Sequence, residues 1–213
     1  MKTKISLLLI CFFLSACDNV LEEEVFSSLG PSNFYSSAED AESLLNAAYA
    51  QGQAYSNLVR DWVCMGEATT EIFIEREGGI NALFNPMEQF TWDAGHSYLL
   101  DQWRRWYSGV YYANTVLDNV PDIDMNEERK TQILAEARFL RAMFYSWMYD
   151  FWGPVPLITT SKTTPQDRPT RATDAEFVKF VEDEFSAVSE ILPVTQEEYP
   201  RATKGAALGF LTR

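Results

Sequence analysis

Residues 127–157 read EERKTQILAEARFLRAMFYSWMYDFWGPVPL, and this stretch decides the fold class. Its apolar side chains recur every three or four residues, which is the period of an α-helix that buries one face. The stripe consists of Ile133, Ala137, Leu140, Phe144, Trp147, Met148 and Phe151. Asn126 or Asp124 can cap the start of this helix, and Gly153-Pro154 ends it, because proline cannot continue the backbone hydrogen-bond pattern. The stretch therefore predicts one long amphipathic helix.

Further helices are predicted upstream of this stretch. Ser36-Ser37-Ala38-Glu39 reads as a capping box at the start of one helix. A second helix is expected from about Ser97 to Val120, where a proline ends it. Between them, Glu71 to Glu77 indicates a short extended piece, and the rest of 66–95 reads as a loop with paired glycines and Pro86.

Two more helices are predicted downstream. Thr173-Asp174-Ala175-Glu176 is a second capping box, and the helix that it opens is closed by Pro193. A last helix begins after Arg201, and the sequence stops at Arg213 with the apolar face of this helix uncovered. We therefore expect the N-terminal part of a longer protein. The alternative is a complete protein whose terminal helix docks on its own fold.

Helix after helix, joined by short polar or proline-containing segments, predicts an all-α protein built from antiparallel helix pairs. Such pairs can stack as a tetratricopeptide-like array with loop insertions. The sequence shows no clean self-similarity at the tetratricopeptide period of about 34 residues. The prediction of this architecture therefore depends on the helix pattern and not on a visible repeat.

The charge of the chain excludes one large class of function. Its 213 residues carry a net charge of −14, so no basic surface is available to neutralise nucleic-acid phosphates. The same charge opposes electrostatic attachment to an anionic membrane. Any membrane association needs another physical basis, and the N-terminus provides one.

The N-terminus resembles the signal of a bacterial lipoprotein. Lys2 and Lys4 precede an apolar run of signal-peptide length from Ile5 to Leu14. Leu14-Ser15-Ala16-Cys17 is similar to a lipobox, which predicts a signal peptide over 1–16 and acylation of Cys17, with palmitate among the expected chains. Residues 17–35 then read as a lipidated, acidic tether and 36–213 as the helical domain. An ordinary secretory signal with a chance cysteine is the alternative.

The remaining chemistry argues against catalysis. After removal of the signal and acylation of Cys17, Cys64 is the one remaining thiol, and its apolar neighbours predict a buried, inert side chain. His96 is the single histidine, which excludes a multi-histidine metal site, and we expect a surface or capping role for it. The acidic cluster Glu182-Asp183-Glu184 reads as a solvated helix face. No metal or other cofactor is predicted.

Four segments, in the expected order, resemble the SusD/RagB family of outer-membrane nutrient-uptake lipoproteins. The first is the lipidated start, and the second is a helix rich in tryptophan, tyrosine and asparagine. The third is the most recognisable run of the family, and the fourth begins a later repeat helix. The segments are residues 17–24, 103–114, 135–157 and 200–208.

This resemblance implies a non-catalytic protein on a tetratricopeptide-like scaffold, lipid-anchored in the cell outer membrane and facing the exterior. Family members capture oligosaccharides, or peptides in some cases, and deliver them to a TonB-dependent, SusC-like β-barrel transporter. Nutrient oligosaccharide is thus the expected ligand and the barrel the expected partner. A helical-repeat lipoprotein scaffold that binds a protein partner is the alternative.

Sugar binding needs a flat aromatic surface and hydrogen-bonding groups around it. Trp92 precedes a predicted helix and is the candidate loop aromatic, with packing against the helix start as the alternative. Arg76, Asn81 and Asn85 are candidate polar contacts in the same insertion. Three other tryptophans fall on buried stripes and two arginines read as scaffold residues that pair with acids. These are Trp103, Trp106 and Trp147, and Arg138 and Arg141.

Overall fold

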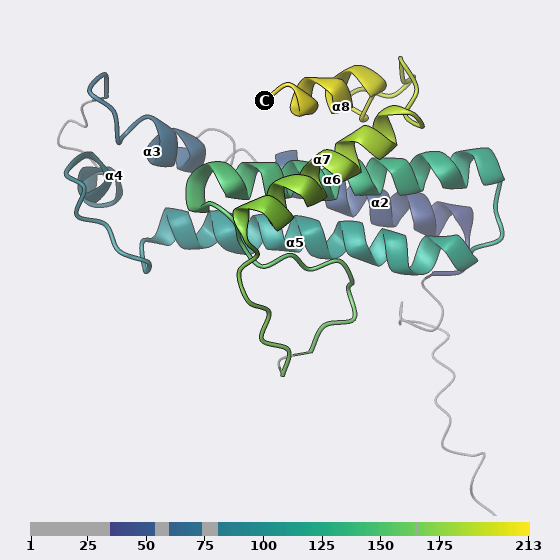
Figure 1. The fold of residues 1–213 in the computed structure, drawn as a ribbon, viewed down its shortest axis with the longest axis horizontal. Helices are drawn as coiled ribbons and strands as arrows, with labels where there is room; N and C mark the ends of the chain where they lie inside the picture. Colours follow the sequence, from purple (N-terminus) through teal and green to yellow (C-terminus); the bar gives the residue numbers. More distant parts are fainter. Residues whose placement is uncertain (1–34, 54–59, 74–80, 165) are drawn as a thin grey trace, which may run out of the picture. The chain divides into compact units, whose positions relative to one another are not determined.

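The computed structural model describes residues 35–53, 60–73, 81–164 and 166–213. The predicted signal peptide, Cys17, most of the tether and Arg76 lie outside these residues, as does most of the expected extended piece. The described residues form helices and contain no strand, which confirms the all-α prediction. The helices are α2 (Ala38–Gln53), α3 (Trp62–Gly66), α4 (Asn81–Glu88), α5 (Ser97–Asn119), α6 (Glu127–Trp152), α7 (Asp174–Ser189) and α8 (Lys204–Leu211) (Figure 1).

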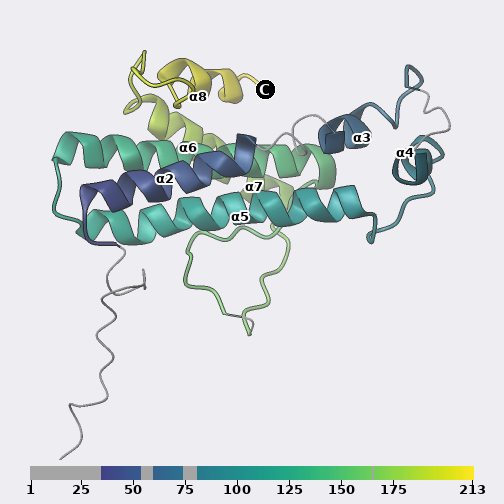
Figure 2. The same ribbon diagram turned by 180° about the vertical axis from the view of Figure 1, so that it is seen from behind.

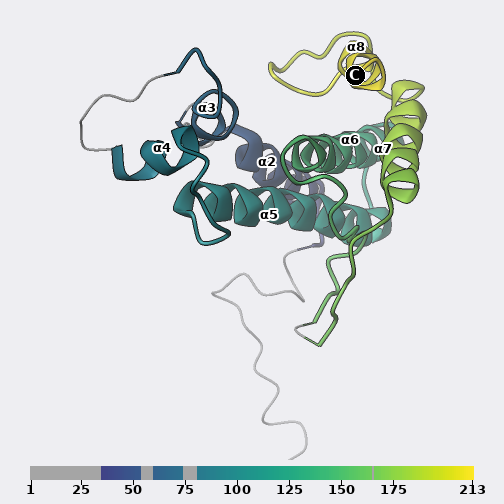
Figure 3. The same cartoon turned by 60° about the vertical axis from the view of Figure 1, so that its left-hand side comes forward.

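Helices α5 and α6 form the centre of the fold. They pack along each other and are joined by the single 3₁₀ turn η2 (Val120–Asp122), so they run antiparallel. Helix α2 packs on both of them, while α7 packs on α6 from the other side, as the views in Figures 1 and 2 show. Helix α8 packs on α7 (Figure 3). Each helix thus buries its apolar face against a neighbour in sequence or space.

The sequence of α6 explains its length and both of its ends. Five of its predicted stripe residues are fully buried, namely Ile133, Ala137, Leu140, Phe144 and Met148. At the start, the Asn126 side chain accepts a hydrogen bond from the Arg129 amide at 3.0 Å, so Asn126 and not Asp124 is the cap. At the end, Gly153 adopts a positive φ of 67°, a conformation that favours glycine.

The start of α2 differs from the predicted capping box by one residue. The cap is Ser37, whose hydroxyl oxygen accepts a hydrogen bond from the Asp40 amide at 3.2 Å. The Asp40 carboxylate in return accepts hydrogen bonds from the amides of Ser36 and Ser37. The prediction of Ser36 with Glu39 was therefore wrong, because the neighbouring pair has the same spacing and makes these bonds instead. The box at Thr173 and Glu176 is confirmed.

The region 66–95, which reads as a loop in the sequence, contains helix α4. Phe84 and Met87 lie three residues apart on α4, and both are buried in a second small core with Cys64 and Tyr98. Burial of these side chains offsets the cost of Pro86, which lies inside the helix and lacks an amide donor. The prediction of a structureless segment was wrong because proline and glycine obscured this apolar pair.

Cys64 lies in this second core, as its apolar neighbours predict. Its side chain is fully buried, and burial raises the pKa of the thiol to about 12. The thiol is therefore protonated near neutral pH, the state expected of an inert cysteine.

The main core is dense in aromatic rings, and it includes the three tryptophans predicted to be structural. Trp106 is fully buried, and Trp103 and Trp147 are half-buried against the same core. Trp62 of α3 contacts the rings of Trp106 and Trp147 edge to face, with ring centroids 5.7 and 5.2 Å apart. These contacts tie α3 to the central helices. The prediction that these three tryptophans belong to the core is confirmed.

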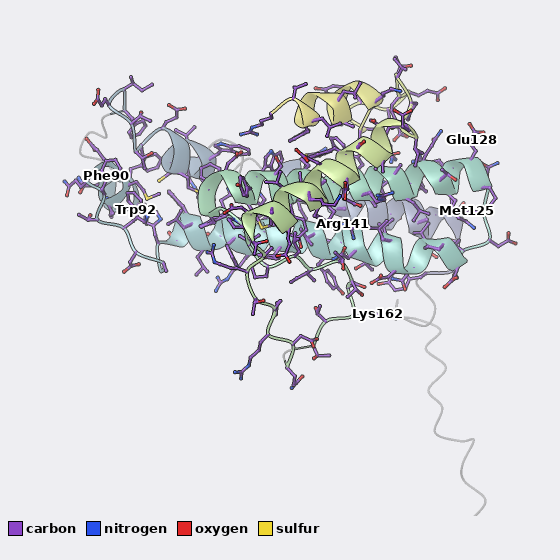
Figure 4. All side chains as sticks on the ribbon, in the orientation of Figure 1. Phe90, Trp92, Met125, Glu128, Arg141 and Lys162 are labelled. Atoms are coloured by element: carbon purple, nitrogen blue, oxygen red, sulfur yellow. The ribbon has the colours of Figure 1, made fainter. Side chains whose placement is uncertain are left out.

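A buried ionic cluster joins α6 to α7. Arg138 and Arg141 donate hydrogen bonds to opposite carboxylate oxygens of Glu184, at 2.7 and 2.8 Å. Arg141 also bonds Asn114 of α5 at 2.8 Å, and its position is labelled in Figure 4. The scaffold role of both arginines is confirmed. The prediction of a solvated Glu182-Asp183-Glu184 cluster was wrong for Glu184, which faces α6 because it shares a helix side with Phe177 and Val188.

Candidate functional site

The segment 89–96 between α4 and α5 presents two aromatic rings to solvent. Phe90 is 66% exposed and Trp92 is 37% exposed. Their ring centroids lie 5.4 Å apart with an interplanar angle of 43°, so the two rings form one tilted surface (Figure 4). We call this pair the 90/92 platform. Two large rings exposed side by side form an apolar patch, and such patches are typical of surfaces that bind a ligand or partner.

Backbone hydrogen bonds fix the platform to the end of α4. The Phe90 amide donates to the Met87 carbonyl at 3.2 Å, and the Thr91 amide donates to the Pro86 carbonyl at 2.9 Å. Phe90 has a positive φ of 55°, a conformation that is rare for a large side chain and turns its ring outward. Such strain is found at functional positions, where the surrounding structure holds it in place.

His96 holds the other end of the segment. It occupies the N-cap position of α5 but makes no side-chain capping bond. Its ring is buried instead, and Nε2 donates to the Leu83 carbonyl of α4 at 2.7 Å. The expected surface or capping role was therefore wrong, because this bond to α4 takes the side chain inward. The consequence is a segment fastened to both α4 and α5.

The structure describes only some of the residues that were predicted as polar contacts. Asn85 is half-buried on α4, one helical turn after Asn81, the first residue of that helix. Arg76 lies outside the described residues. The ring of Trp92 lies beside that of Phe90. Trp92 is 37% exposed, so part of its side chain packs against the protein and part faces solvent.

Phe90 is the site residue that the sequence reasoning missed. The spacing of two residues between Phe90 and Trp92 was visible, and in an extended segment it places both side chains on one side. The positive φ of Phe90 was not visible, because nothing in the sequence marks that conformation for phenylalanine. The platform therefore has two rings where one was expected.

Chemically, the platform can bind but offers no reactive group. The described residues hold no cluster of three or more histidine, cysteine, aspartate or glutamate side chains that fits a metal ion. None of the helices in the described ranges is both long and apolar enough to cross a bilayer. An apolar, flat and exposed surface of this kind suits the C–H face of a sugar ring or an apolar side chain.

Comparisons with known proteins indicate the family of the chain. Residues 21–213 match the SusD-like family model described as starch-binding and associating with the outer membrane. A SusD-like protein of Formosa agariphila is 32% identical over 193 residues, which cover 87% of this chain and 36% of that protein. A SusD-like protein of Bacteroides ovatus is 35% identical over 117 residues, which cover 52% of this chain and 21% of that protein.

Solved structures have the same fold. A laminarin-binding SusD-like protein superposes with a TM-score of 0.74 at 23% identity, covering 83% of this chain and 39% of the other. A SusD homologue from Bacteroides thetaiotaomicron gives a TM-score of 0.69 at 25% identity, covering 84% and 36%. The chain thus spans well under half the length of these proteins. The match of the family model, which covers every helix of the described residues, shows that the chain belongs to the SusD/RagB family.

Proposed function

We propose that this protein captures nutrient oligosaccharides at the cell surface without transforming them, and passes them to a TonB-dependent, SusC-like transporter. The observation that carries the proposal is the exposed 90/92 platform in a chain whose family model is described as starch-binding. The rings take the apolar face of a sugar, and Asn85 with Asn81 and Arg76 of the same insertion bond its hydroxyl groups.

The anchor and the location belong to the same proposal. Acylation of Cys17 after removal of residues 1–16 attaches the chain to the outer membrane, and residues 17–35 separate the lipid from the helices. Two or more acyl chains hold a protein stably on a bilayer, which a retained binding protein needs. The surface of an acidic protein makes no contribution to this attachment, since it is repelled by anionic lipids.

The binding part is tested by titrating purified protein with a panel of neutral oligosaccharides, including those from laminarin and starch. The expected result is saturable binding that Trp92→Ala and Phe90→Ala each weaken by about 0.5–1.5 kcal/mol, the stacking contribution of one ring. Tyr199→Ala is the matched control, because Tyr199 is 98% exposed and lies near α8. If no oligosaccharide binds, or if both variants bind like the native chain, the platform is not a sugar site.

The remaining parts have separate tests. Cys17→Ser should leave an unprocessed, unacylated precursor, and normal membrane attachment of that variant would remove the lipoprotein assignment. Detergent extracts of cells that make the native chain should yield a co-purifying TonB-dependent barrel. Co-purification of another protein in place of a barrel, together with no sugar or peptide binding, favours the helical scaffold instead.

A further inference from the structure

The first turns of α5 line a polar cavity that is distinct from the 90/92 platform. This cavity has a volume of about 360 Å³ and lies between α5 and the residues that flank α3. Arg104, Arg105 and Asp101 line it from α5, and Arg60 and Asp61 line it from the chain before α3. Three arginines in one cavity are notable in a chain whose net charge is −14.

Two of these arginines have no ionic partner. Arg60 is bonded to Asp61 and lies over the ring of Tyr98, with its guanidinium carbon 4.3 Å from the ring centroid. In the described part of the chain, the side chains of Arg104 and Arg105 make neither an ion pair nor a hydrogen bond, and Nε of Arg105 is buried without a partner. A guanidinium placed in this way has free donors suited to an oxyanion.

Asp61 brings a carboxylate to the same cavity. Its side chain is fully buried, and one carboxylate oxygen, Oδ1, accepts a hydrogen bond from Arg60. The other oxygen, Oδ2, is buried and has no hydrogen-bond partner. This unpaired oxygen is enclosed by protein, so Asp61 acts here as the partner of Arg60. The donors of the cavity that are free for an oxyanion are those of Arg104 and Arg105.

An aromatic surface adjoins this cavity. A second hollow of about 430 Å³ shares Arg104 and Ser108 with the first and is otherwise lined by rings. Trp103, Tyr107 and Tyr111 are spaced four residues apart and so follow one side of α5. The rings of Trp103 and Tyr107 have centroids 5.0 Å apart, and Tyr111 is 49% exposed. Charged and aromatic groups thus meet at Arg104.

We propose that this surface of α5 binds a saccharide that carries a carboxylate, namely a uronic-acid residue within an oligosaccharide. Arg104 and Arg105 pair with the carboxylate, and a neighbouring sugar ring lies on Tyr107 and Tyr111. A simple anion engages the arginines alone, whereas a uronic acid within an oligosaccharide also covers the rings that adjoin them. This inference rests on the proposed sugar-binding function and adds a second, acid-specific surface to it.

The test compares an oligogalacturonate with a neutral malto-oligosaccharide of the same length by calorimetric titration of the purified protein. Four variants are compared with the native chain: Arg104→Gln with Arg105→Gln, Tyr111→Ala, Trp92→Ala, and the control Arg168→Gln. Arg168 is exposed in the segment before α7, so the control removes charge away from α5. Circular dichroism and thermal unfolding establish that each variant is folded.

The native chain should bind oligogalacturonate, and the double arginine variant should lose at least about tenfold in affinity, since each hydrogen bond to a charged group contributes that much or more. Trp92→Ala and Arg168→Gln should keep most of this affinity. Added salt should weaken acid binding to the native chain more than to the double variant. Tyr111→Ala should lower the affinity by about two- to tenfold.

The inference is overturned if the double variant binds oligogalacturonate as well as the native chain does. It is also overturned if a sulfated oligosaccharide or a glutamate-rich peptide binds this surface and the uronate does not. If the chain binds the neutral malto-oligosaccharide through Trp92 but does not bind oligogalacturonate, this inference alone is overturned. Absence of binding to every saccharide removes the proposed function with it.

Discussion

Gly109 lies at the contact between α5 and α6, and its replacement by alanine tests whether these helices are as closely packed as the structure shows. A Cβ atom at this position would lie 2.4 Å from Cε2 of Phe144 and 2.5 Å from Cζ. Two carbon atoms in ordinary contact are about 3.5–4.0 Å apart, so the ring or the helix would have to move by about 1 Å. Phe144 is fully buried and has no open side to move into.

The magnitude is the difference between two opposing effects. Overpacking a core costs about 1–3 kcal/mol, and the clash of the new Cβ atom with the buried Phe144 ring places Gly109→Ala in the upper part of that range. Alanine in a helix interior gains up to about 1 kcal/mol over glycine. We expect a net loss of about 2 kcal/mol in the free energy of unfolding. For a domain of this size that corresponds to a fall of roughly 4–8 °C in the melting temperature.

Urea unfolding followed by circular dichroism measures this loss, and Gly209→Ala is the matched control. Gly209 is in the exposed part of α8, and a Cβ there has no atom within 4 Å, so the same substitution should stabilise by up to about 1 kcal/mol. Phe144→Leu combined with Gly109→Ala should cost less than the sum of the two, because the smaller side chain leaves room for the new methyl group. A Gly109→Ala chain as stable as the native one would show that the interface is looser than described.

Three further predictions concern charge and reactivity. Glu184→Gln should destabilise the fold by about 3 kcal/mol or more, because it leaves the buried Arg141 guanidinium without its carboxylate partner. Asp183→Asn, on the exposed side of α7, is the control and should cost at most about 0.5 kcal/mol. Urea unfolding measures both values. The hydrogen bond from Arg129 holds the pKa of Glu42 in the folded protein below its ordinary value of 4.5. Ionised Glu42 therefore stabilises the fold above pH 4.5, and this stabilisation is lost as the pH falls through the folded-state pKa. Glu42→Gln should accordingly flatten the acid limb of a stability–pH curve, and an unchanged limb would exclude this pair as its cause. Burial raises the pKa of the Cys64 thiol to about 12, so iodoacetamide near pH 8 should label Cys64 only after unfolding. Peptide mass spectrometry measures the labelling, and rapid labelling of the native chain would contradict the burial of this thiol.

The regular helices were predictable because local signals and the buried stripe agree. Asn126 at the start of α6, Thr173 with Glu176 at the start of α7 and the glycine after α6 all mark boundaries that the structure confirms. The cap of α2 shows the limit of such signals. Two overlapping four-residue patterns with the same spacing compete there, and only the geometry of the Asp40 carboxylate decides between them.

The errors occur where long-range contacts override local preference. Helix α4 contains Pro86, and it forms because Phe84 and Met87 reach a core made with Cys64, nearly twenty residues earlier in the chain. Glu184 is one of three consecutive acids, and only the position of α6 determines that it alone is buried. The α5 cavity was likewise not predictable, since Asp61 and Arg105 meet only after α3 packs against α5.

The proposed α5 surface depends on how α5 is seated in the core, and this links the stability predictions to the functional ones. His96 ties the segment of the 90/92 platform to α4 at the point where α5 begins. Arg104 and Tyr111 lie on the turns of α5 that flank Gly109, on the side away from Trp106. A shift of about 1 Å forced at Gly109 is therefore transmitted to the α5 cavity, because a helix moves as a rigid element. The platform is held by its own bonds to α4, so Gly109→Ala should weaken acid binding more than neutral binding at temperatures where the variant remains folded.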